Sequence, residues 1–173
     1  MLLFLYTLWL LKMDRYRTAI IVTAVVVILD QISKWLVVKY VPLYDKIQVL
    51  PFLDITHIIN RGAAFGIFSD LSEAVRLPLF ALVLVAAVII IFFFLKKAGP
   101  GDKLLVYSLG LIMGGAVGNS IDRFKLRYVT DFIDFHWFGD PALNWPPFNL
   151  ADSAITIGVI LIMFDTFILK RGR

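Results

Sequence analysis

The sequence predicts an all-α polytopic membrane protein with four transmembrane helices. Hydrophobic residues make up 60% of the 173 residues and charged residues only 17%, and the apolar residues gather into four long stretches. A helix needs about 20 residues to cross a hydrocarbon layer of roughly 30 Å, and lipid offers no partner for an unpaired backbone amide. We therefore expect a single membrane domain with helices at residues 18–38, 77–95, 104–121 and 151–169.

Basic residues predict the orientation of these helices. They cluster before the first stretch, between the second and third, and after the fourth, at Lys12, Arg15, Arg17, Lys96, Lys97, Lys103, Lys170, Arg171 and Arg173. Four crossings place all of these clusters on one side, and the side rich in lysine and arginine is cytoplasmic. Segments 39–76 and 122–150 then lie on the other side. The net charge of +4 is thereby explained by the basic residues that orient the helices in the membrane. No nucleic-acid partner is expected.

The two outer segments have strand-like stretches. Polar and apolar residues alternate from Asp54 to Ile58, which predicts a short strand, and Pro51 limits any strand through it to an edge or a break. A similar composition recurs from Tyr128 to Phe135. Between them, "RGAAFGIFSD" predicts a turn leading into a short interfacial helix, and Ser72 is expected to cap the second transmembrane helix.

Residues 1–12 are treated as an extension. They are apolar but too short to span a membrane, and they lack the basic start and small-residue cleavage site of a signal peptide. Met13 is followed by "DRYR" and looks like the natural translation start of the protein. We expect the extension to be an upstream mis-start or an accessory interfacial segment.

Several kinds of catalytic and metal site are excluded or disfavoured. The chain has no cysteine, which excludes a thiol nucleophile, a thiolate metal site and disulfides. Its two histidines, His57 and His136, stand in no HExxH motif, which argues against a histidine-based zinc site. No GxSxG motif is present, and Ser33 and Lys34 are adjacent, so they point in different directions on a helix. No metal and no cofactor are expected.

Polar residues inside the apolar stretches are candidates for function. Asp30 and Lys34 are four residues apart and share a helix face. They either neutralise each other and pin helix packing or act directly, since ionisable groups within a membrane are usually functional. In "GGAVGNSIDR", residues 114–123, the glycines allow close helix packing, whereas Asn119 and Arg123 lie at the outer end of the third stretch.

Three aspartates converge on the same outer edge. Asp131 and Asp134 lie in "VTDFIDF", and Asp152 opens the fourth helix, where the positive helix end favours a carboxylate. Each alone has an ordinary structural explanation. Two carboxylates that share a site cannot both ionise easily, so one keeps its proton. The ionised partner can take a proton from water while the other donates to a peptide carbonyl, as in aspartic proteases.

From Met13 onward the chain resembles the lipoprotein signal peptidase, or signal peptidase II, family. Five motifs carry the resemblance in the family's order: "DQISK" at 30–34, "NRGAAFGIF" at 60–68, "GGAVGNSIDR" at 114–123, "VTDFIDF" at 129–135 and "FNLADS" at 148–153. Five motifs in order on a four-span layout are far more specific than any one of them.

The resemblance implies an aspartyl endopeptidase of the bacterial inner membrane, with cytoplasmic termini and its site near the periplasmic face. It would cleave the signal peptide from a diacylglyceryl-modified prolipoprotein just before the lipidated cysteine, without metal or cofactor. Its catalytic residues would be Asp131, rather than Asp134, and Asp152. The supporting residues would be Asn119, Arg123, Asn149, Asn60, Asp30 and Lys34.

The resemblance also implies a small periplasmic β-cradle, a mobile segment over the active site, and membrane lipids and substrate-mimicking cyclic peptide inhibitors as partners. We expect a monomer. The family often carries glycine where this chain has Arg127. Because glycine adopts a left-handed turn without steric cost, Arg127 predicts a turn of another shape.

Two other classes of function stay open at this point. A small membrane transporter could use Asp30, Lys34 and Asp152 as relay charges, although the second apolar stretch contains no charge. A non-enzymatic assembly factor would tolerate the loss of either aspartate.

Overall fold

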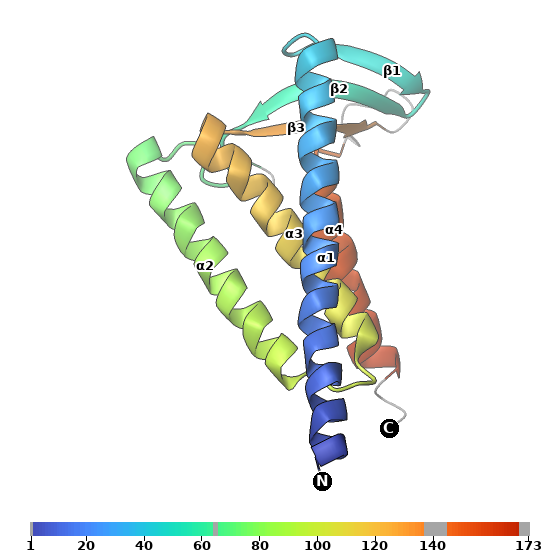
Figure 1. Ribbon diagram of the computed structural model, residues 1–173. Coiled ribbons are helices and arrows are strands. Elements are labelled where there is room, and N and C mark those ends of the chain that lie inside the picture. The colour runs from blue at the N-terminus through green and yellow to red at the C-terminus, as the bar shows by residue number, and fades with distance from the viewer. Residues whose placement is uncertain (1, 64–65, 137–144, 170–173) are drawn as a thin grey trace.

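Four long helices form a bundle with a three-stranded sheet across one end (Figure 1). The computed structural model describes residues 2–63, 66–136 and 145–169, with side chains from residue 15 to residue 168. The helices are α1 (Leu2–Tyr40), α2 (Glu73–Lys97), α3 (Lys103–Leu126) and α4 (Leu150–Phe164), and α4 continues as a π-helix, Asp165–Leu169. Within the described part, four helices are long and apolar enough to cross a membrane: Arg15–Tyr40, Glu73–Lys97, Lys103–Leu126 and Leu150–Ile168.

Each apolar stretch predicted from the sequence lies inside one of these helices. The helices α2 and α3 extend a few residues beyond the predicted stretches, and α1 extends furthest, at its start. The helix α1 begins at Leu2, so the backbone of residues 2–12, which we treated as an extension, continues the first helix. Met1 lies outside the described residues. Ser72 occupies the N-cap position of α2, as the sequence predicts, but its side chain makes no capping hydrogen bond.

The strands lie in the two segments where the sequence predicts them. β1 (Lys46–Leu50), β2 (Leu53–Asn60) and β3 (Val129–Phe135) form an antiparallel sheet in the order β1-β2-β3. Pro51 falls in the turn between β1 and β2, where its missing N–H breaks no ladder. The short interfacial helix expected after Asn60 includes residues 64 and 65, which lie outside the described residues, and the segment 67–70 forms turns.

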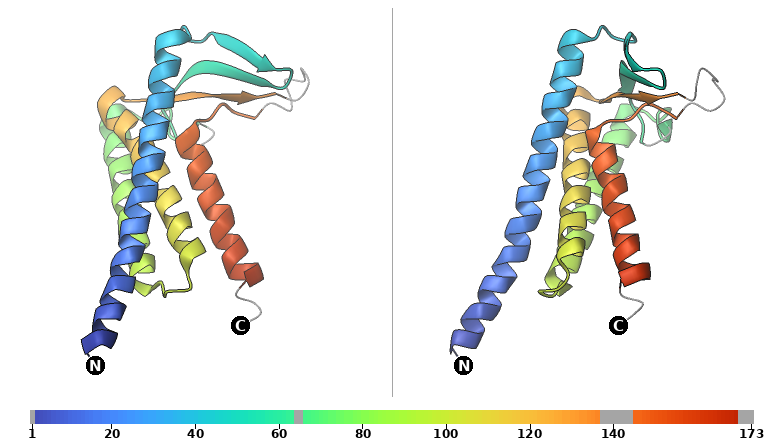
Figure 2. Two further views of the ribbon diagram at one scale, coloured as in Figure 1. Left: turned by 45° about the vertical axis from the view of Figure 1, so that its right-hand side comes forward. Right: turned by 90° about the vertical axis from the view of Figure 1, so that its right-hand side faces the viewer.

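The sheet lies at the end of the bundle opposite the start of α1 and the end of α4 (Figure 2). Val37 of α1 and Val41, which follows the helix, pack against Phe132 of β3 and fix the sheet there. A bridge between Ile133 and Phe148 then brings the segment before α4 beside β3. The start of α4 is thereby placed next to the middle of β3.

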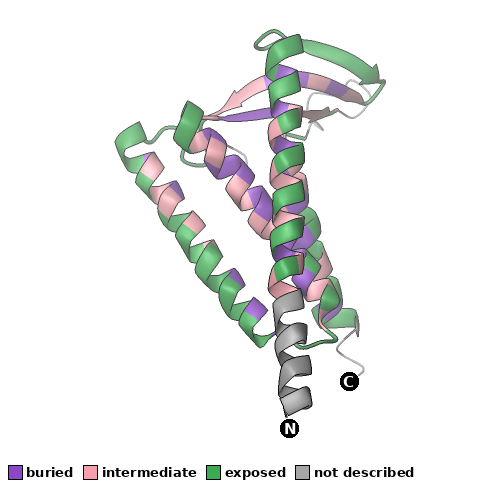
Figure 3. Ribbon diagram, viewed as in Figure 1, coloured by how far each residue is buried: buried purple, intermediate pink, exposed green. Residues whose placement is uncertain are grey.

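The helix α3 is the centre of the bundle and packs against α1, α2 and α4. Its glycines face its neighbours: a Cβ on Gly115 would overlap the carbonyl oxygen of Ala151 in α4, and one on Gly118 would lie 2.7 Å from a carboxylate oxygen of Asp30 in α1. Small residues let helices approach this closely. Most buried residues therefore lie in α3 and in the strands β2 and β3. The helix α2 is exposed over most of its length (Figure 3).

Candidate active site

A cavity of about 1170 Å³ lies between α2, α3 and α4 beneath the sheet. It arises because α2 packs against the bundle through Ile91 and Leu95 near its far end. Toward the sheet α2 stays beside α3 but diverges from α4 (Figure 1). The wall is mainly apolar, and its polar members include five residues that the sequence singles out: Asn60, Asn119, Arg123, Asp131 and Asp152. The site is thus an apolar chamber with a polar end.

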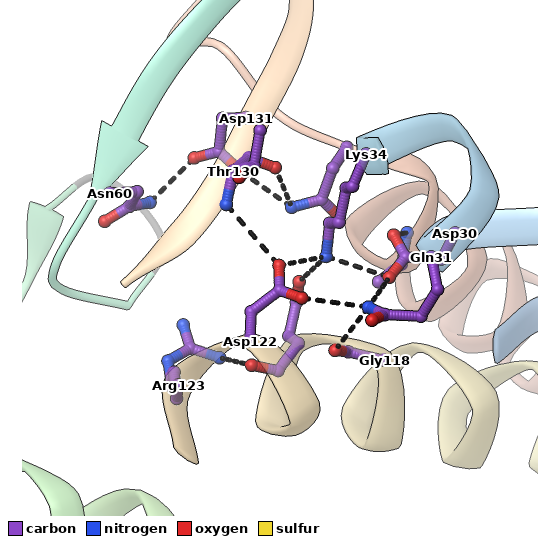
Figure 4. A network of polar contacts seen from close by, with 12 residues as sticks. Asp30, Gln31, Lys34, Asn60, Gly118, Asp122, Arg123, Thr130 and Asp131 are labelled. Atoms are coloured by element: carbon purple, nitrogen blue, oxygen red, sulfur yellow. Dashed lines mark hydrogen bonds and ion pairs between the residues drawn. The ribbon is translucent and has the colours of Figure 1, made fainter. Parts of the chain in front are cut away.

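Asp131 occupies the third position of β3, and only 2% of its surface is exposed. Its two carboxylate oxygens accept hydrogen bonds from two amide side chains. Asn60 at the end of β2 donates at 2.9 Å (Figure 4), and Asn149 donates at 2.7 Å. The carboxylate is therefore held from both sides, by the neighbouring strand and by the segment that leads into α4.

Asp152 is the third residue of α4 and belongs to a capping box with Asn149. The side-chain oxygen of Asn149 accepts from the backbone N–H of Asp152 at 3.0 Å, and the Asp152 carboxylate accepts from the backbone N–H of Asn149 at 3.3 Å. Such a pair satisfies two amides that the start of a helix leaves free. The other Asp152 oxygen accepts from Asn119 at 2.7 Å. One asparagine, Asn149, therefore bonds to both aspartates.

Burial raises the pKa of Asp131 from 3.8 to about 6. Removing a carboxylate from water disfavours its charged form, and the charge of Asp152 acts in the same direction. The hydrogen bonds from Asn60 and Asn149 oppose this effect by stabilising the carboxylate, and so does the charge of Lys34. The net result is a carboxyl group that holds a proton in mildly acidic conditions.

A buried ion network around Lys34 lies near Asp131 (Figure 4). The ammonium of Lys34 is 2.8 Å from Asp30 and 2.9 Å from Asp122, and it donates to the side-chain oxygen of Asn119 at 2.9 Å. This last bond fixes the Asn119 amide so that its nitrogen faces Asp152. Buried charges are tolerated only when they are paired and hydrogen-bonded, and here three donor positions of the ammonium are used.

Asp30 also joins α1 to α4. Its second oxygen accepts from the backbone N–H of Ala151 at 3.0 Å. An amide at the start of a helix has no partner within the helix, so Asp30 satisfies one such amide in α4. The structure thus brings Asp30 and Lys34 together on one face of α1, as their spacing predicts, and connects both to the residues around Asp152.

Sequence reasoning missed two members of this network, Asp122 and Gln31. Gln31 donates to Asp122 at 2.9 Å, and the backbone N–H of Thr130 points to the other Asp122 oxygen at 3.5 Å. A signal was present in the sequence. Asp122 follows Asn119 by three residues, and such residues share a helix face. The spacing within the first apolar stretch predicts only Asp30 as the partner of Lys34, although one buried ammonium can hold two carboxylates.

Arg123 lines the cavity and lies between α2 and the segment that follows β2. Its guanidinium donates to the backbone oxygen of Gly62 at 2.9 Å and lies 4.3 Å from the ring centroid of Phe80. Contact with an aromatic face suits a guanidinium. Arg123 therefore connects the segment after β2 to α2 and puts a positive charge on the cavity that Asp131 and Asp152 line.

Asp134 is separated from the cavity by the geometry of its strand. It is opposite Asp54 in the register of β2 and β3, whereas Asp131 is opposite Ile58. Residues three apart on a strand point to opposite faces. Asp131 lines the cavity and Asp134 is not among its lining residues. Strand geometry therefore places Asp131 and not Asp134 in the cavity wall, and the catalytic role of Asp131 stays a prediction.

The turn between α3 and β3 corrects one prediction. The sequence predicts a turn of another shape at Arg127, but this is wrong, because Arg127 has φ 73° and ψ 4°, the left-handed conformation. Its N–H donates to the backbone oxygen of Arg123 at 3.1 Å and closes the end of α3. This conformation costs a residue other than glycine about 1 kcal/mol. The cap and the start of β3 two residues later hold Arg127 in it.

Comparison with known proteins assigns the family. The family model described as signal peptidase (SPase) II matches residues 22–168. The chain belongs to the signal peptidase II family. A lipoprotein signal peptidase of Geobacter metallireducens is 43% identical over 151 residues, or 87% of this chain and 90% of the relative. One of Syntrophotalea carbinolica is 36% identical over 154 residues, or 88% of this chain and 92% of the relative.

Solved structures of membrane enzymes share the fold. Two structures described as a bacterial membrane enzyme, obtained by the in meso method at 2.3 and 1.9 Å resolution, are both 37% identical to this chain. Their TM-scores are 0.75 and 0.73. The first match covers 87% of each chain, and the second covers 86% of this chain and 92% of the other. The chain is thus a multi-pass membrane protein and a signal peptidase, which sets aside the transporter and the assembly factor.

Proposed function

We propose that this chain is an aspartic endopeptidase that removes the signal peptide from diacylglyceryl-modified prolipoproteins, cutting just before the lipidated cysteine. The observation that supports it is the pair of aspartates at the polar end of an apolar cavity. Asp131 comes from a strand and Asp152 from a helix, and Asn149 bonds to both. The family and its named relatives point to the same substrate class.

In the proposed reaction the two carboxyl groups share one proton. The ionised carboxylate takes a proton from water, and the water oxygen attacks the scissile carbonyl carbon. The protonated group gives its proton to the carbonyl oxygen. When the tetrahedral intermediate collapses, the C–N bond breaks and the carboxyl group that took the water proton gives it to the amine of the lipidated cysteine. A hydroxyl group of the intermediate returns its proton to the other carboxylate. The signal peptide leaves with a new carboxyl group, and the pair again holds one proton.

The remaining predicted residues hold this pair and the substrate. Asn119, Asn149 and Asn60 orient the carboxylates by the hydrogen bonds described above. The guanidinium of Arg123 lies on the cavity and would stabilise negative charge on the carbonyl oxygen in the intermediate. Asp30 and Lys34 act through Asn119 and the start of α4, so we assign them a positioning role.

The apolar cavity suits the rest of the substrate. A signal helix would enter sideways from the bilayer between α2 and α4, and the lipidated cysteine would lie beside the aspartates. We place the sheet and the site on the periplasmic side of the inner membrane, because the described members of the basic clusters lie at the opposite end of the helices, namely Arg15, Arg17, Lys96, Lys97 and Lys103. The substrate, membrane lipids and substrate-mimicking cyclic peptides are the proposed partners of a monomer.

The test is a gel-shift cleavage assay with a diacylated prolipoprotein in detergent. Asp131→Asn and Asp152→Asn should each fold and lose at least about a thousandfold in cleavage rate, because each removes an acid or base from the reaction. Asp134→Asn is the matched control on the same strand and should cleave at close to the parent rate. Cleavage at the parent rate by either of the first two variants would refute the pair, and loss in the control would reopen the choice of aspartate.

A further inference from the structure

A second, smaller cavity of about 550 Å³ lies outside the proposed catalytic site, where α2 begins and α3 ends. Its lining includes three arginines, Arg61, Arg76 and Arg127, but only one acidic residue, Glu73. Two of the three positive charges thus have no acidic partner among the lining residues. The remaining lining residues are Ser69, Leu71, Leu126 and Tyr128. A cavity with this wall attracts an anion.

Arg76 is built into the cavity wall. It is 6% exposed, and one terminal nitrogen donates to the backbone oxygens of Ser69 at 3.3 Å and Leu71 at 3.2 Å. Its Nε is buried and has no hydrogen-bond partner among the described residues. A buried donor without a partner costs free energy. The guanidinium is therefore held in place by the protein while part of its bonding capacity is unused.

Arg127 reaches the same cavity from a backbone conformation that costs an arginine more than a glycine. Its Nε is 3.3 Å from a carboxylate oxygen of Glu73, and both side chains are about half exposed. Exposed ion pairs of this kind contribute little to stability. The pair does not explain an arginine at a left-handed position, and Arg127 is free to exchange Glu73 for a stronger anion. Guanidinium groups bind phosphate oxygens with two parallel hydrogen bonds.

The position of the cavity indicates which anion it meets. Glu73 begins one membrane-spanning helix and Leu126 ends another, so the arginines lie at the level of the lipid headgroups. Apolar residues that line the cavity or lie close to its lining in the sequence are exposed, namely Leu71, Val75, Phe124 and Leu126. A free anion would gain nothing from these apolar neighbours, whereas a phospholipid would place its acyl chains against them.

We infer that this cavity binds the phosphate group of an anionic membrane phospholipid, with Arg61, Arg76 and Arg127 as its ligands. This second lipid site is independent of the proposed reaction, because none of its residues lines the catalytic cavity. The bound headgroup would also hold together the start of α2 and the end of α3.

The test uses the whole chain in detergent, titrated with phosphatidylglycerol and followed by native mass spectrometry. The parent should retain one lipid more tightly than the others. The double variant Arg61→Gln, Arg127→Gln should bind that lipid about tenfold or more weakly, because it loses two charge-assisted contacts. These arginines are chosen because both are exposed, whereas replacing Arg76 would also remove hydrogen bonds that hold the fold.

Lys125→Gln is the matched control, since Lys125 is exposed, lies two residues before Arg127 and does not line the cavity. It should bind the lipid as the parent does. Equal weakening in this control, or parent-like binding by the double variant, would overturn the site. Inorganic phosphate distinguishes the source of the anion. If millimolar phosphate occupies the arginines and phosphatidylglycerol does not, the lipid assignment is wrong.

Discussion

Asn149 shows how one side chain can organise the proposed site. It is fully buried. Its amide oxygen accepts from the start of α4, and its amide nitrogen donates to Asp131. An aspartate here could still cap the helix, but it could not donate, and it would add a third buried carboxylate. A serine could cap the helix but is too short to reach Asp131 as well. Only asparagine caps the helix and bridges to the strand with one side chain.

At the same scale, the raised pKa of Asp131 predicts a pH-dependent stability. The pKa is 3.8 in the unfolded chain and about 6 in the folded one, so between these values the folded chain binds more protons. Stability therefore falls as pH rises from about 4 to about 6, by about 3 kcal/mol in total, and the loss stays constant above that.

The variant Asp131→Asn isolates this effect, because it keeps the size of the side chain and removes the ionisation. Thermal melting in detergent at several pH values should show the parent losing stability relative to the variant between pH 4 and pH 6. Above about pH 7 the difference in Tm should no longer change. Parallel melting profiles for the two proteins over the whole range would contradict a buried carboxyl with a raised pKa.

At the scale of elements, the close contact of α3 and α4 sets the position of Asp152. A Cβ on Gly115 would overlap the backbone oxygen of Ala151, the residue before Asp152. Because the obstacle is backbone, the start of α4 must move. Gly115→Ala should destabilise the fold by about 1–3 kcal/mol, as overpacked cores do, and should lower cleavage more than stability alone explains.

Melting and cleavage assays on the same preparation separate the two effects. Gly101→Ala is the control for this substitution, because nothing lies within 4 Å of a Cβ at Gly101, and it should behave as the parent. A Gly115→Ala variant with the parent's Tm and cleavage rate would show that the two helices can separate without disturbing Asp152.

Elements were more predictable from the sequence than the contacts between them. The four helices follow from the length of apolar runs, and the strand around Asp54 follows from local alternation. The partnership of Lys34 with Asp122 was missed because it joins α1 to α3, 88 positions apart, and local periodicity holds no information on such pairs. The left-handed turn at Arg127 was missed because the cap and the following strand override the residue's own preference.

At the scale of the whole molecule, the divergence of α2 gives the bundle its substrate-sized cavity. α2 carries exposed apolar residues over most of its length and packs on α3 rather than closing over α4. Lipid covers such a surface at no hydrophobic cost, so the helix can stand apart in a membrane as it could not in water. An apolar substrate helix could replace the lipid in this space, because it would cover the same apolar surface of α2.

This geometry predicts that filling the cavity blocks the substrate while the fold persists. Ala87 lines the cavity from α2, and Ala87→Trp should lower kcat/KM for a diacylated prolipoprotein at least about tenfold, mainly through KM, because the indole occupies the binding space and leaves the aspartates in place. Ile90→Trp puts the same ring on α2 at an exposed position that does not line the cavity. Parent-like cleavage by the Ala87 variant, or equal loss in the Ile90 variant, would mean that the substrate does not enter between α2 and α4.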